Sequence, residues 1–222
     1  MKKIVLDIET CGVSMEELSS SQQEFLLRDI EEERASEIER TLSYYPFTSK
    51  VIAIGMMDLE SGKSAVYYES EEDEQWDSGE DNIKFAGRTE CDMLKLFWKI
   101  MARTELVITF NGRLFDIPFL MVRSAILKIK PVKNFVRNRF DKRHHIDLMD
   151  QLSFYGSIRK FNLDFYCHAF GVTSPKTKEL NGREIKNYYK DGRIREIAQY
   201  CARDVKATYE LFNIWNEYLN LE

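Results

Sequence analysis

The sequence is poor in cysteine, and its four cysteines are far apart. They stand at positions 11, 91, 167 and 201 and form no Cys-x-x-Cys pair, which argues against a zinc site and against a disulfide-stabilised scaffold. No apolar run approaches the roughly 18 residues of a membrane-spanning helix. An acid at position 7 also interrupts the start of the chain, where a signal peptide would be apolar. These absences predict a protein of the reducing cytoplasm that does not associate with membranes.

The chain also lacks internal repeats and any linker rich in proline, glycine or serine. Its 222 residues are 44% hydrophobic and 31% charged, a balance that is typical of a globular protein with a full core. Because no boundary is visible in the composition, we expect residues 1–222 to form a single domain.

Short apolar runs alternate with segments of helical periodicity. We interpret as strands the runs 2–8, 105–112, 144–150 and the two halves of 49–70, which flank a Ser-Gly turn. We interpret as helices the periodic segments 89–103, 116–127, 161–172 and 193–219. Thr89 is placed to cap the first of these helices, and Gly171 to end the third. This order predicts an α/β protein with a mixed five-stranded sheet flanked by helices.

Two segments fall outside this alternation. Residues 13–47 contain a Ser14-x-x-Glu17 capping pattern followed by apolar residues at multiples of four. We therefore expect a helical insertion after the first strand. Residues 69–81 are mostly acidic, and the simplest interpretation is an exposed loop.

Positive charge is concentrated in one part of the chain. The net charge of −5 does not indicate a nucleic-acid-binding protein, yet residues 121–145 hold eight Lys and Arg against one acid, Asp141. A basic stretch on an acidic protein can bind phosphates. It can equally be a solvated loop and helix face, and the sequence leaves both interpretations open.

Two acids, Asp7 and Glu9, end the first apolar run. Since successive strand side chains point to opposite faces, these two share one face. Carboxylates that close together repel each other and lose hydration when the face is covered. A cation between them would remove both penalties. The alternative is a strand that frays into a polar loop.

Further acids stand where two helices meet the core. Asp116 begins a helix among apolar residues, and its simplest role there is an N-cap. In the last helix, Tyr200 and Asp204 are four residues apart and lie on one face beside the apolar stripe. Their simplest roles are a boundary aromatic and an acid paired with a Lys or Arg.

Taken as a set, Asp7, Glu9, Asp116 and Asp204 indicate a metal site. Oxygen ligands without a Cys or His set suit Mg²⁺ or Mn²⁺. Two such ions can activate a water molecule and stabilise the leaving oxygen of a phosphodiester. We therefore expect two divalent cations and chemistry at a phosphodiester bond.

The motifs that contain these acids resemble those of the DEDD 3′–5′ exonucleases. They are Leu-Asp-Ile-Glu-Thr at 6–10, Thr-Phe-Asn-Gly-Arg-Leu-Phe-Asp-Ile-Pro-Phe-Leu at 109–120 and Tyr-Cys-Ala-Arg-Asp at 200–204. The Tyr-x-x-x-Asp spacing is that of the tyrosine-containing branch. The chain is most similar to the proofreading exonuclease of family B DNA polymerases, and Asp147 lies in a stretch similar to the one between the second and third motifs.

The resemblance covers about 48–222 plus the first strand, and it implies a ribonuclease H-like fold. It leaves 13–47 unaccounted for. It leaves no room for a polymerase domain, so we expect a stand-alone nuclease. The implied reaction removes nucleoside 5′-monophosphates from the 3′ end of single-stranded DNA by a two-metal-ion mechanism.

The resemblance also implies a role for each matching residue. Asp7, Glu9 and Asp204 would hold the first ion, and Asp7 would reach the second, with Asp116 acting through water. Glu9 would contact the terminal 3′-OH, and Tyr200 would orient the attacking water. Thr10, Asn111 and Phe115 would be substrate-binding. The resemblance gives His144 and His145 no role, and Asp147 is expected to support the site structurally.

Two other functions remain open at this point. One is an exoribonuclease that trims RNA 3′ ends with the same site, since nothing in the sequence reads the 2′-OH. The other is a nuclease-like module that binds nucleic acid without catalysis. Such a module should have lost at least one acid, whereas all four acids and Tyr200 are present.

Overall fold

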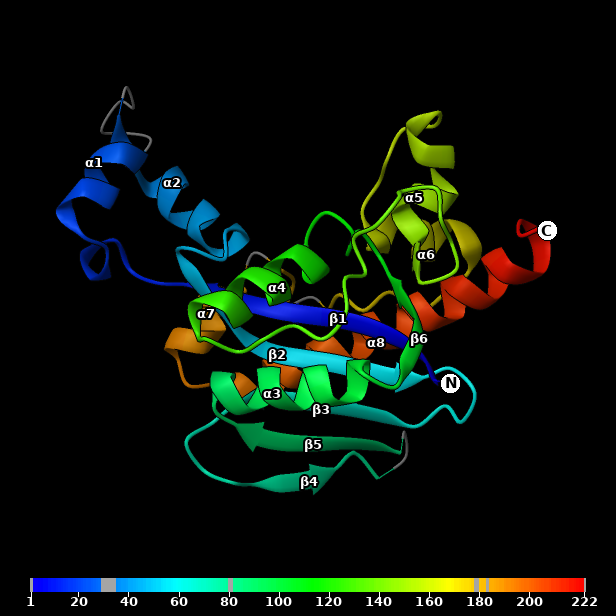
Figure 1. The fold of residues 1–222 in the computed structure, drawn as a ribbon, viewed down its shortest axis with the longest axis horizontal. Helices are drawn as coiled ribbons and strands as arrows, with labels where there is room; N and C mark the ends of the chain where they lie inside the picture. Colours follow the sequence, from blue (N-terminus) through cyan, green and yellow to red (C-terminus); the bar gives the residue numbers. More distant parts are fainter. Residues whose placement is uncertain (1, 29–34, 80–81, 178–179, 183, 222) are drawn as a thin grey trace.

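The computed structural model describes residues 2–28, 35–79, 82–177, 180–182 and 184–221. Within these residues, a seven-stranded mixed sheet has the order β4-β5-β3-β2-β1-β6-β7 (Figure 1). The strands are β1 (Lys2–Gly12), β2 (Ser49–Asp58), β3 (Ser64–Glu69), β4 (Gln75–Asp77), β5 (Ile83–Arg88), β6 (Thr104–Thr109) and β7 (His145–Asp147). The pairs β1–β2, β2–β3 and β4–β5 are antiparallel, and β3–β5, β1–β6 and β6–β7 are parallel.

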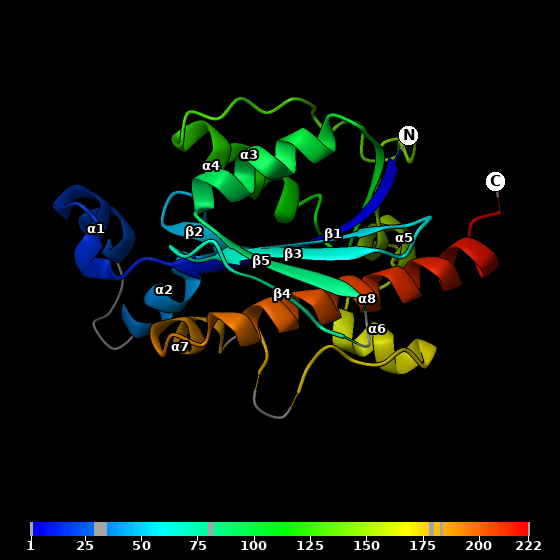
Figure 2. The same ribbon diagram turned by 90° about the horizontal axis from the view of Figure 1, so that it is seen from below.

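Helices cover both faces of this sheet (Figure 2). Four of the helices that pack on the sheet or at its edge are α3 (Glu90–Met101), α4 (Asp116–Ile126), α6 (Leu163–Phe170) and α8 (Ile194–Tyr218). The other α-helices of the described residues are α1 (Ser20–Leu27), α2 (Ala35–Thr41), α5 (Leu148–Leu152) and α7 (Ile185–Lys190). Three single 3₁₀ turns in the same segments are η1 (Met15–Glu17), η3 (Leu42–Tyr44) and η4 (Phe154–Gly156). Helices α3 and α4 pack on one face, and α6, α7 and α8 pack on the other. The α/β class and the mixed sheet are as predicted. None of the helices in the described segments is long and apolar enough to cross a membrane.

The predicted number of strands was wrong, because β4 and β5 extend the sheet beyond β3. Strand β4 lies inside the acidic run that we expected to be an exposed loop. Its Trp76 ring stacks on Phe85 of β5 with a centroid separation of 3.8 Å and an interplanar angle of 3°. The preceding acid Glu74 forms an ion pair with Arg195 of α8, which reduces the repulsion within the run. Aromatic packing and ion pairing therefore stabilise a strand where composition favoured a loop.

Element ends follow local chemistry in most places. The Thr89 side chain accepts a hydrogen bond from the Asp92 N–H at the start of α3, and Gly171 ends α6 with a left-handed φ of 71°, both as predicted. The predicted strand 144–150 is wrong after Asp147. The Asp147 carboxylate accepts from the Met149 N–H at 3.0 Å and so caps α5.

The predicted helical insertion is present and extends to one side of the sheet (Figure 1). It includes η1, α1, α2 and η3, and residues 29–34 lie outside the described part of the chain. The Ser14 N–H donates to Glu17 Oε1 at 2.9 Å, as the capping pattern predicts. The last part of the insertion packs back against Gly12, the last residue of β1. A Cβ on Gly12 would lie 2.8 Å from the Ser43 nitrogen. Glycine at this position lets η3 pack directly against β1.

The basic stretch 121–145 covers the second half of α4 and the segment that leads to β7. Several of its cations bind within the protein. Lys133 donates to the Thr104 carbonyl at 2.8 Å, Arg139 pairs with the buried Asp150, and Arg143 pairs with Asp141. Arg137 is exposed and has no ion-pair partner among the described residues. Much of this charge is therefore neutralised by the protein's own acids.

Candidate active site

Asp7 and Glu9 lie within β1 rather than at its end, because β1 continues pairing with β2 as far as Gly12. The alternative of a strand that frays into a polar loop is therefore excluded. Ile4, Leu6 and Ile8 point to the face covered by α3 and α4, whereas Val5 packs in the core beneath α6 and α8. By alternation, the two acids share the α8 face with Val5. A bulge follows at once: Glu9 pairs with Ala53 and Thr10 with Val51, which leaves Ile52 without a partner.

Asp204 on α8 completes a cluster with the two strand acids. One carboxylate oxygen from each of Asp7, Glu9 and Asp204 lies within 4.8 Å of the others. This approach depends on Gly55 of β2, which pairs with Asp7. A Cβ on Gly55 would lie 2.8 Å from Cys201 Sγ and 2.8 Å from a Val205 methyl. The absence of that Cβ lets α8 pack close to the sheet.

Asp116 joins the cluster through the backbone of β1. Strand β6 pairs with β1 only as far as Val5, so the Ile8 N–H on that side has no strand partner. Instead it donates to Asp116 Oδ1 at 3.1 Å. The alternative role of Asp116 as an N-cap is excluded, since Phe115 is the N-cap residue and Asp116 is the first residue of the helix. Its buried carboxylate, 3% exposed, is held between the positions of Asp7 and Glu9.

The four acids are buried close together, and this raises the pKa of each. Burial is the main cause in every case. The Asp204 and Asp116 charges further raise the pKa values of Asp7 and Glu9. Asp116 reaches a pKa of about 8 and Asp204 about 7. Near neutral pH the site therefore disfavours full ionisation, and a bound cation would relieve this penalty.

Tyr200 lies one helical turn before Asp204, so the two side chains share one face of α8. The ring is 6% exposed, and the Arg203 guanidinium lies 5.6 Å from its centroid. Burial and the neighbouring carboxylates of Asp204, Glu9 and Asp7 raise the pKa of the phenol far above its ordinary value of 10. Tyr200 is thus a neutral hydroxyl whose oxygen can still accept a hydrogen bond.

The predicted substrate residues lie in β1 and in the segment that joins β6 to α4. The Thr10 hydroxyl donates to the Ser43 carbonyl at 2.7 Å and so ties β1 to the insertion. Asn111 has a left-handed φ of 65° in the turn after β6. Phe115 directly precedes Asp116, and its ring packs on Phe119 at 5.4 Å. The Thr10 hydroxyl is therefore already bonded, whereas the Asn111 and Phe115 side chains remain partly exposed.

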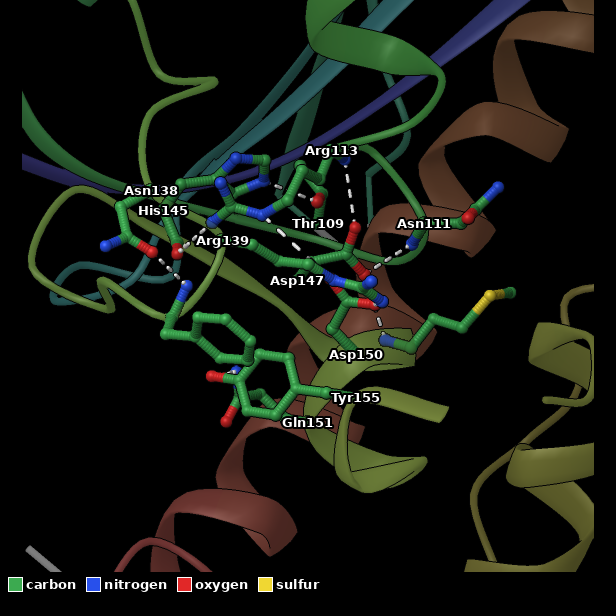
Figure 3. A network of polar contacts seen from close by, with 12 residues as sticks. Thr109, Asn111, Arg113, Asn138, Arg139, His145, Asp147, Asp150, Gln151 and Tyr155 are labelled. Carbon is green, nitrogen blue, oxygen red and sulfur yellow. Dashed lines mark hydrogen bonds and ion pairs between the residues drawn. The ribbon is translucent and has the colours of Figure 1, made fainter. Parts of the chain in front are cut away.

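A buried polar network holds the Asn111 turn in place (Figure 3). Asp147 at the end of β7 accepts from the Asn111 N–H and the Arg113 N–H, each at 2.9 Å. The Arg113 guanidinium donates to the His145 carbonyl at 3.0 Å and lies 4.0 Å from Asp150. Asp147 therefore supports the turn that carries Asn111, which gives a structural basis for the supporting role expected of it.

His145 is a core residue of this network. Its Nε2 lies 2.8 Å from the Thr109 hydroxyl and its Nδ1 lies 3.2 Å from the Phe135 carbonyl. Burial lowers the pKa of this imidazole to about 3, so it stays neutral. His144 is partly buried, with Nδ1 3.2 Å from the Glu105 carbonyl.

Sequence reasoning missed two residues that shape the cluster, Gly55 and Cys201. The Cys201 thiol lies 3.6 Å from the Asp7 carbonyl and 3.7 Å from its carboxylate. Burial and the surrounding acids raise the thiol pKa, so Cys201 packs as a neutral group. A glycine in a strand interior is a known signal of close backbone approach, and Gly55 could have been found in that way.

Comparison with known proteins agrees with this geometry. A family model described as a predicted 3′–5′ exonuclease related to the exonuclease domain of PolB matches residues 47–218. A DNA polymerase of Desulfurococcus sp. (strain Tok) is 31% identical over 140 residues, which are 55% of this chain and 18% of the polymerase. A DNA polymerase of Thermococcus gorgonarius is 30% identical over 140 residues, with the same coverage. This chain therefore spans less than a fifth of these relatives.

A solved structure shows the same fold. The family B DNA polymerase of Pyrobaculum calidifontis superposes with a TM-score of 0.63 over 97% of this chain and 24% of the polymerase, at 16% identity. The expected ribonuclease H-like fold is confirmed by this match. With the family model covering most of the sequence, the chain belongs to the predicted 3′–5′ exonucleases related to the exonuclease domain of family B DNA polymerases.

Proposed function

We propose that this protein is a metal-dependent exonuclease that removes nucleotides from the 3′ end of single-stranded DNA. The observation that carries this proposal is the cluster of Asp7, Glu9 and Asp204, whose carboxylate oxygens lie within 4.8 Å of one another. Asp116 is held against the same strand through the Ile8 N–H. These acids match the residues of the three motifs in order along the chain.

The donor set fits two divalent cations, Mg²⁺ or Mn²⁺. It consists of hard carboxylate oxygens. Burial raises the pKa of each acid, and bound cations would compensate the negative charges that burial disfavours. Asp7, Glu9 and Asp204 would hold one ion, and Asp7 would also reach the other, with Asp116 acting through water. When bound, such ions activate water and stabilise the leaving oxygen of a phosphodiester.

Tyr200 orients the attacking water rather than deprotonating it. Its raised pKa keeps the phenol neutral, so it cannot act as a base near pH 7. The oxygen of a neutral hydroxyl can accept a hydrogen bond, and Tyr200 would accept one from a water molecule beside the acids. A fixed acceptor at this position lowers the entropic cost of aligning the nucleophile.

The terminal nucleotide would lie between β1 and the turn after β6. Glu9 would contact the terminal 3′-OH, and Asn111 and Phe115 would contact the sugar and base. The Thr10 hydroxyl is bonded to Ser43, so Thr10 would act mainly by placing the insertion beside this nucleotide. Asp147 fixes the Asn111 turn through two backbone hydrogen bonds.

The test is a time course with end-labelled oligonucleotides in Mg²⁺ or Mn²⁺, with products resolved by length. A 5′-labelled single-stranded DNA should shorten one nucleotide at a time and release nucleoside 5′-monophosphates, whereas a 3′-phosphate should block the reaction. RNA of the same sequence and blunt-ended duplexes test which nucleic acid is preferred. If RNA is shortened faster than DNA, then RNA is the substrate. If no oligonucleotide is shortened, the protein is not a nuclease under these conditions, and a binding module is favoured.

A further inference from the structure

A stacked pair of phenylalanines lies at the start of α6, on the face of the sheet that also carries α8, and the proposed reaction does not use it. The rings of Phe161 and Phe165 are 4.0 Å apart with an interplanar angle of 9°. The Arg159 guanidinium lies 5.3 Å from the Phe161 ring centroid. Phe165, in the first turn of α6, is 51% exposed. Phe161 is thus packed between other groups, and Phe165 presents much of its ring to solvent.

A series of ring contacts links this pair to the turn that carries Asn111. The Phe161 ring lies 6.2 Å from Tyr166, and Tyr166 lies 5.7 Å from Phe110, both with edge-to-face geometry. Phe110 directly precedes Asn111. Tyr166 is buried, so these contacts fix the position of the pair relative to the turn.

Core packing places the same helix against α8. Tyr166 and Cys167 of α6 belong to the same buried cluster as Val205, the residue that follows Asp204. Helix α6 packs next to α8 on the same side of the sheet (Figure 2). Lys176 lies 3.2 Å from Asp164, also in α6. The first turn of α6 and Lys176 therefore lie on the face of the sheet that carries Asp204.

The segment that leads to the pair is strained and carries exposed apolar groups. Phe154, Tyr155 and Gly156 have φ values of 48°, 58° and 98°, a left-handed region that bulky side chains disfavour. Tyr155 is held there by Gln151 and by the Phe140 ring (Figure 3). Phe154 and Ile158 are exposed. Such strain persists where the surrounding structure enforces it, often at a binding surface.

We propose that Phe161 and Phe165 form a platform on which an unpaired base of the substrate strand stacks, upstream of the terminal nucleotide. A cation beside stacked rings is the arrangement by which proteins bind single strands without reading sequence. Arg159 and Lys176 supply positive charge for the adjoining phosphates. A paired base cannot present a free face to Phe165, so the platform selects single-stranded substrates. This inference rests on the proposed exonuclease function and defines its substrate class.

Binding tests the platform independently of catalysis. Fluorescence anisotropy with a labelled single-stranded DNA 12-mer in EDTA measures affinity while hydrolysis is blocked. Phe165→Ala should bind about 5- to 100-fold more weakly, the effect of losing one base–aromatic stack. Phe165→Trp keeps a ring and should bind within about twofold of the wild type. The control is Phe25→Ala, which removes a ring that is 70% exposed on α1, at the opposite end of the molecule (Figure 1).

Hydrolysis in Mg²⁺ gives the second readout. Phe165→Ala should raise KM for the 12-mer by the same factor with kcat nearly unchanged, and it should cleave a dinucleotide, which is too short to reach the platform, at the wild-type rate. Equal melting temperatures would show that each variant is folded.

The possible outcomes separate this inference from the proposed function. Wild-type binding by Phe165→Ala, or an equal loss in Phe25→Ala, would overturn the platform and leave the rings as a surface for a protein partner. A wild type that binds the 12-mer through Phe165 but cleaves nothing would support the platform and overturn the exonuclease. A wild type that binds no single strand would overturn the platform.

Discussion

The Asp116 carboxylate accepts a hydrogen bond from the backbone N–H of Ile8, at 3.1 Å between atoms 108 residues apart in sequence. It occupies the side of β1 where pairing with β6 has stopped. One carboxylate oxygen of Asp116 thus accepts a backbone hydrogen bond of β1, and this bond holds the carboxylate beside Asp7 and Glu9. A single side chain both completes the hydrogen bonding of the central strand and adds a fourth acid to the site.

Substitutions of Asp116 should separate these two roles. Asp116→Asn keeps an acceptor for the Ile8 N–H and should fold normally, while exonuclease turnover falls by about 10²-fold or more because the charge is lost. Asp116→Ala leaves a buried N–H without a partner, which costs about 1–3 kcal/mol of stability. Turnover and denaturant unfolding of both variants check this. Equal turnover in Asp116→Asn and the wild type would exclude Asp116 from the chemistry.

Gly55→Ala should reduce activity without changing any acid. The added Cβ would meet Cys201 Sγ and Val205 at 2.8 Å, so α8 must move away from the sheet. Overpacking of this kind costs about 1–3 kcal/mol, and a shift of about 1 Å in Asp204 would lower turnover by about 10²-fold. Gly182→Ala is the control, since a Cβ there meets nothing within 4 Å. Full activity in Gly55→Ala would mean that the close packing of α8 is dispensable.

Tyr200→Phe removes one hydroxyl and keeps the ring that packs at the edge of α8. Substrate and metal affinity should stay nearly unchanged, while turnover falls by roughly tenfold to a thousandfold through loss of a positioning group. If Tyr200 is only a boundary aromatic, Tyr200→Phe will keep full turnover and only Tyr200→Ala will lower the melting temperature. Turnover and melting temperature of both variants distinguish these roles.

The raised acid pKa values predict that the metal-free protein loses stability as pH rises. An unfolded Asp has a pKa near 3.9, whereas folded Asp204 and Asp116 have values of about 7 and about 8. Between these limits the folded protein holds protons that the unfolded chain releases. The contribution of these two acids to the free energy of unfolding is therefore constant below about pH 4 and falls as the pH rises towards 8. Melting curves in EDTA from pH 5 to 9 measure this decline.

Two comparisons make the pH experiment specific to the acid cluster. Asp204→Asn should flatten the decline, and Mg²⁺ should raise the wild-type melting temperature most at pH 8, where the free acids are most ionised. A metal-free melting temperature that rises from pH 5 to 8 would contradict the raised pKa values.

Local pattern was sufficient where the structure depends on neighbours in sequence. The shared face of Asp7 and Glu9 followed from strand alternation. The start of α3 followed from Thr89, and the end of α6 followed from Gly171. The order of the motifs and the family resemblance then indicated which acids would meet. None of this required knowledge of how the helices pack.

Features that depend on distant parts of the chain were not predictable from pattern. The hydrogen bond between Asp116 and the Ile8 N–H was not foreseen, because Ile8 is remote from Asp116 in sequence. Strand β4 was missed because it has three residues within an acidic run and depends on β5 and on Arg195 of α8. The contact between Cys201 and Gly55 likewise arises only when α8 packs on the sheet.

The most direct test of the account is the rate of 3′-nucleotide release by Asp7→Asn. This change keeps the size of the side chain and an oxygen near Cys201. It removes the negative charge of Asp7, which we propose contacts both ions. The account predicts a folded protein that releases nucleotides from a 5′-labelled single strand in Mg²⁺ at a rate at least 10²-fold below the wild type, and a wild type that stops in EDTA. Wild-type rates in Asp7→Asn, or undiminished release in excess EDTA, would contradict a metal-dependent exonuclease site at these acids.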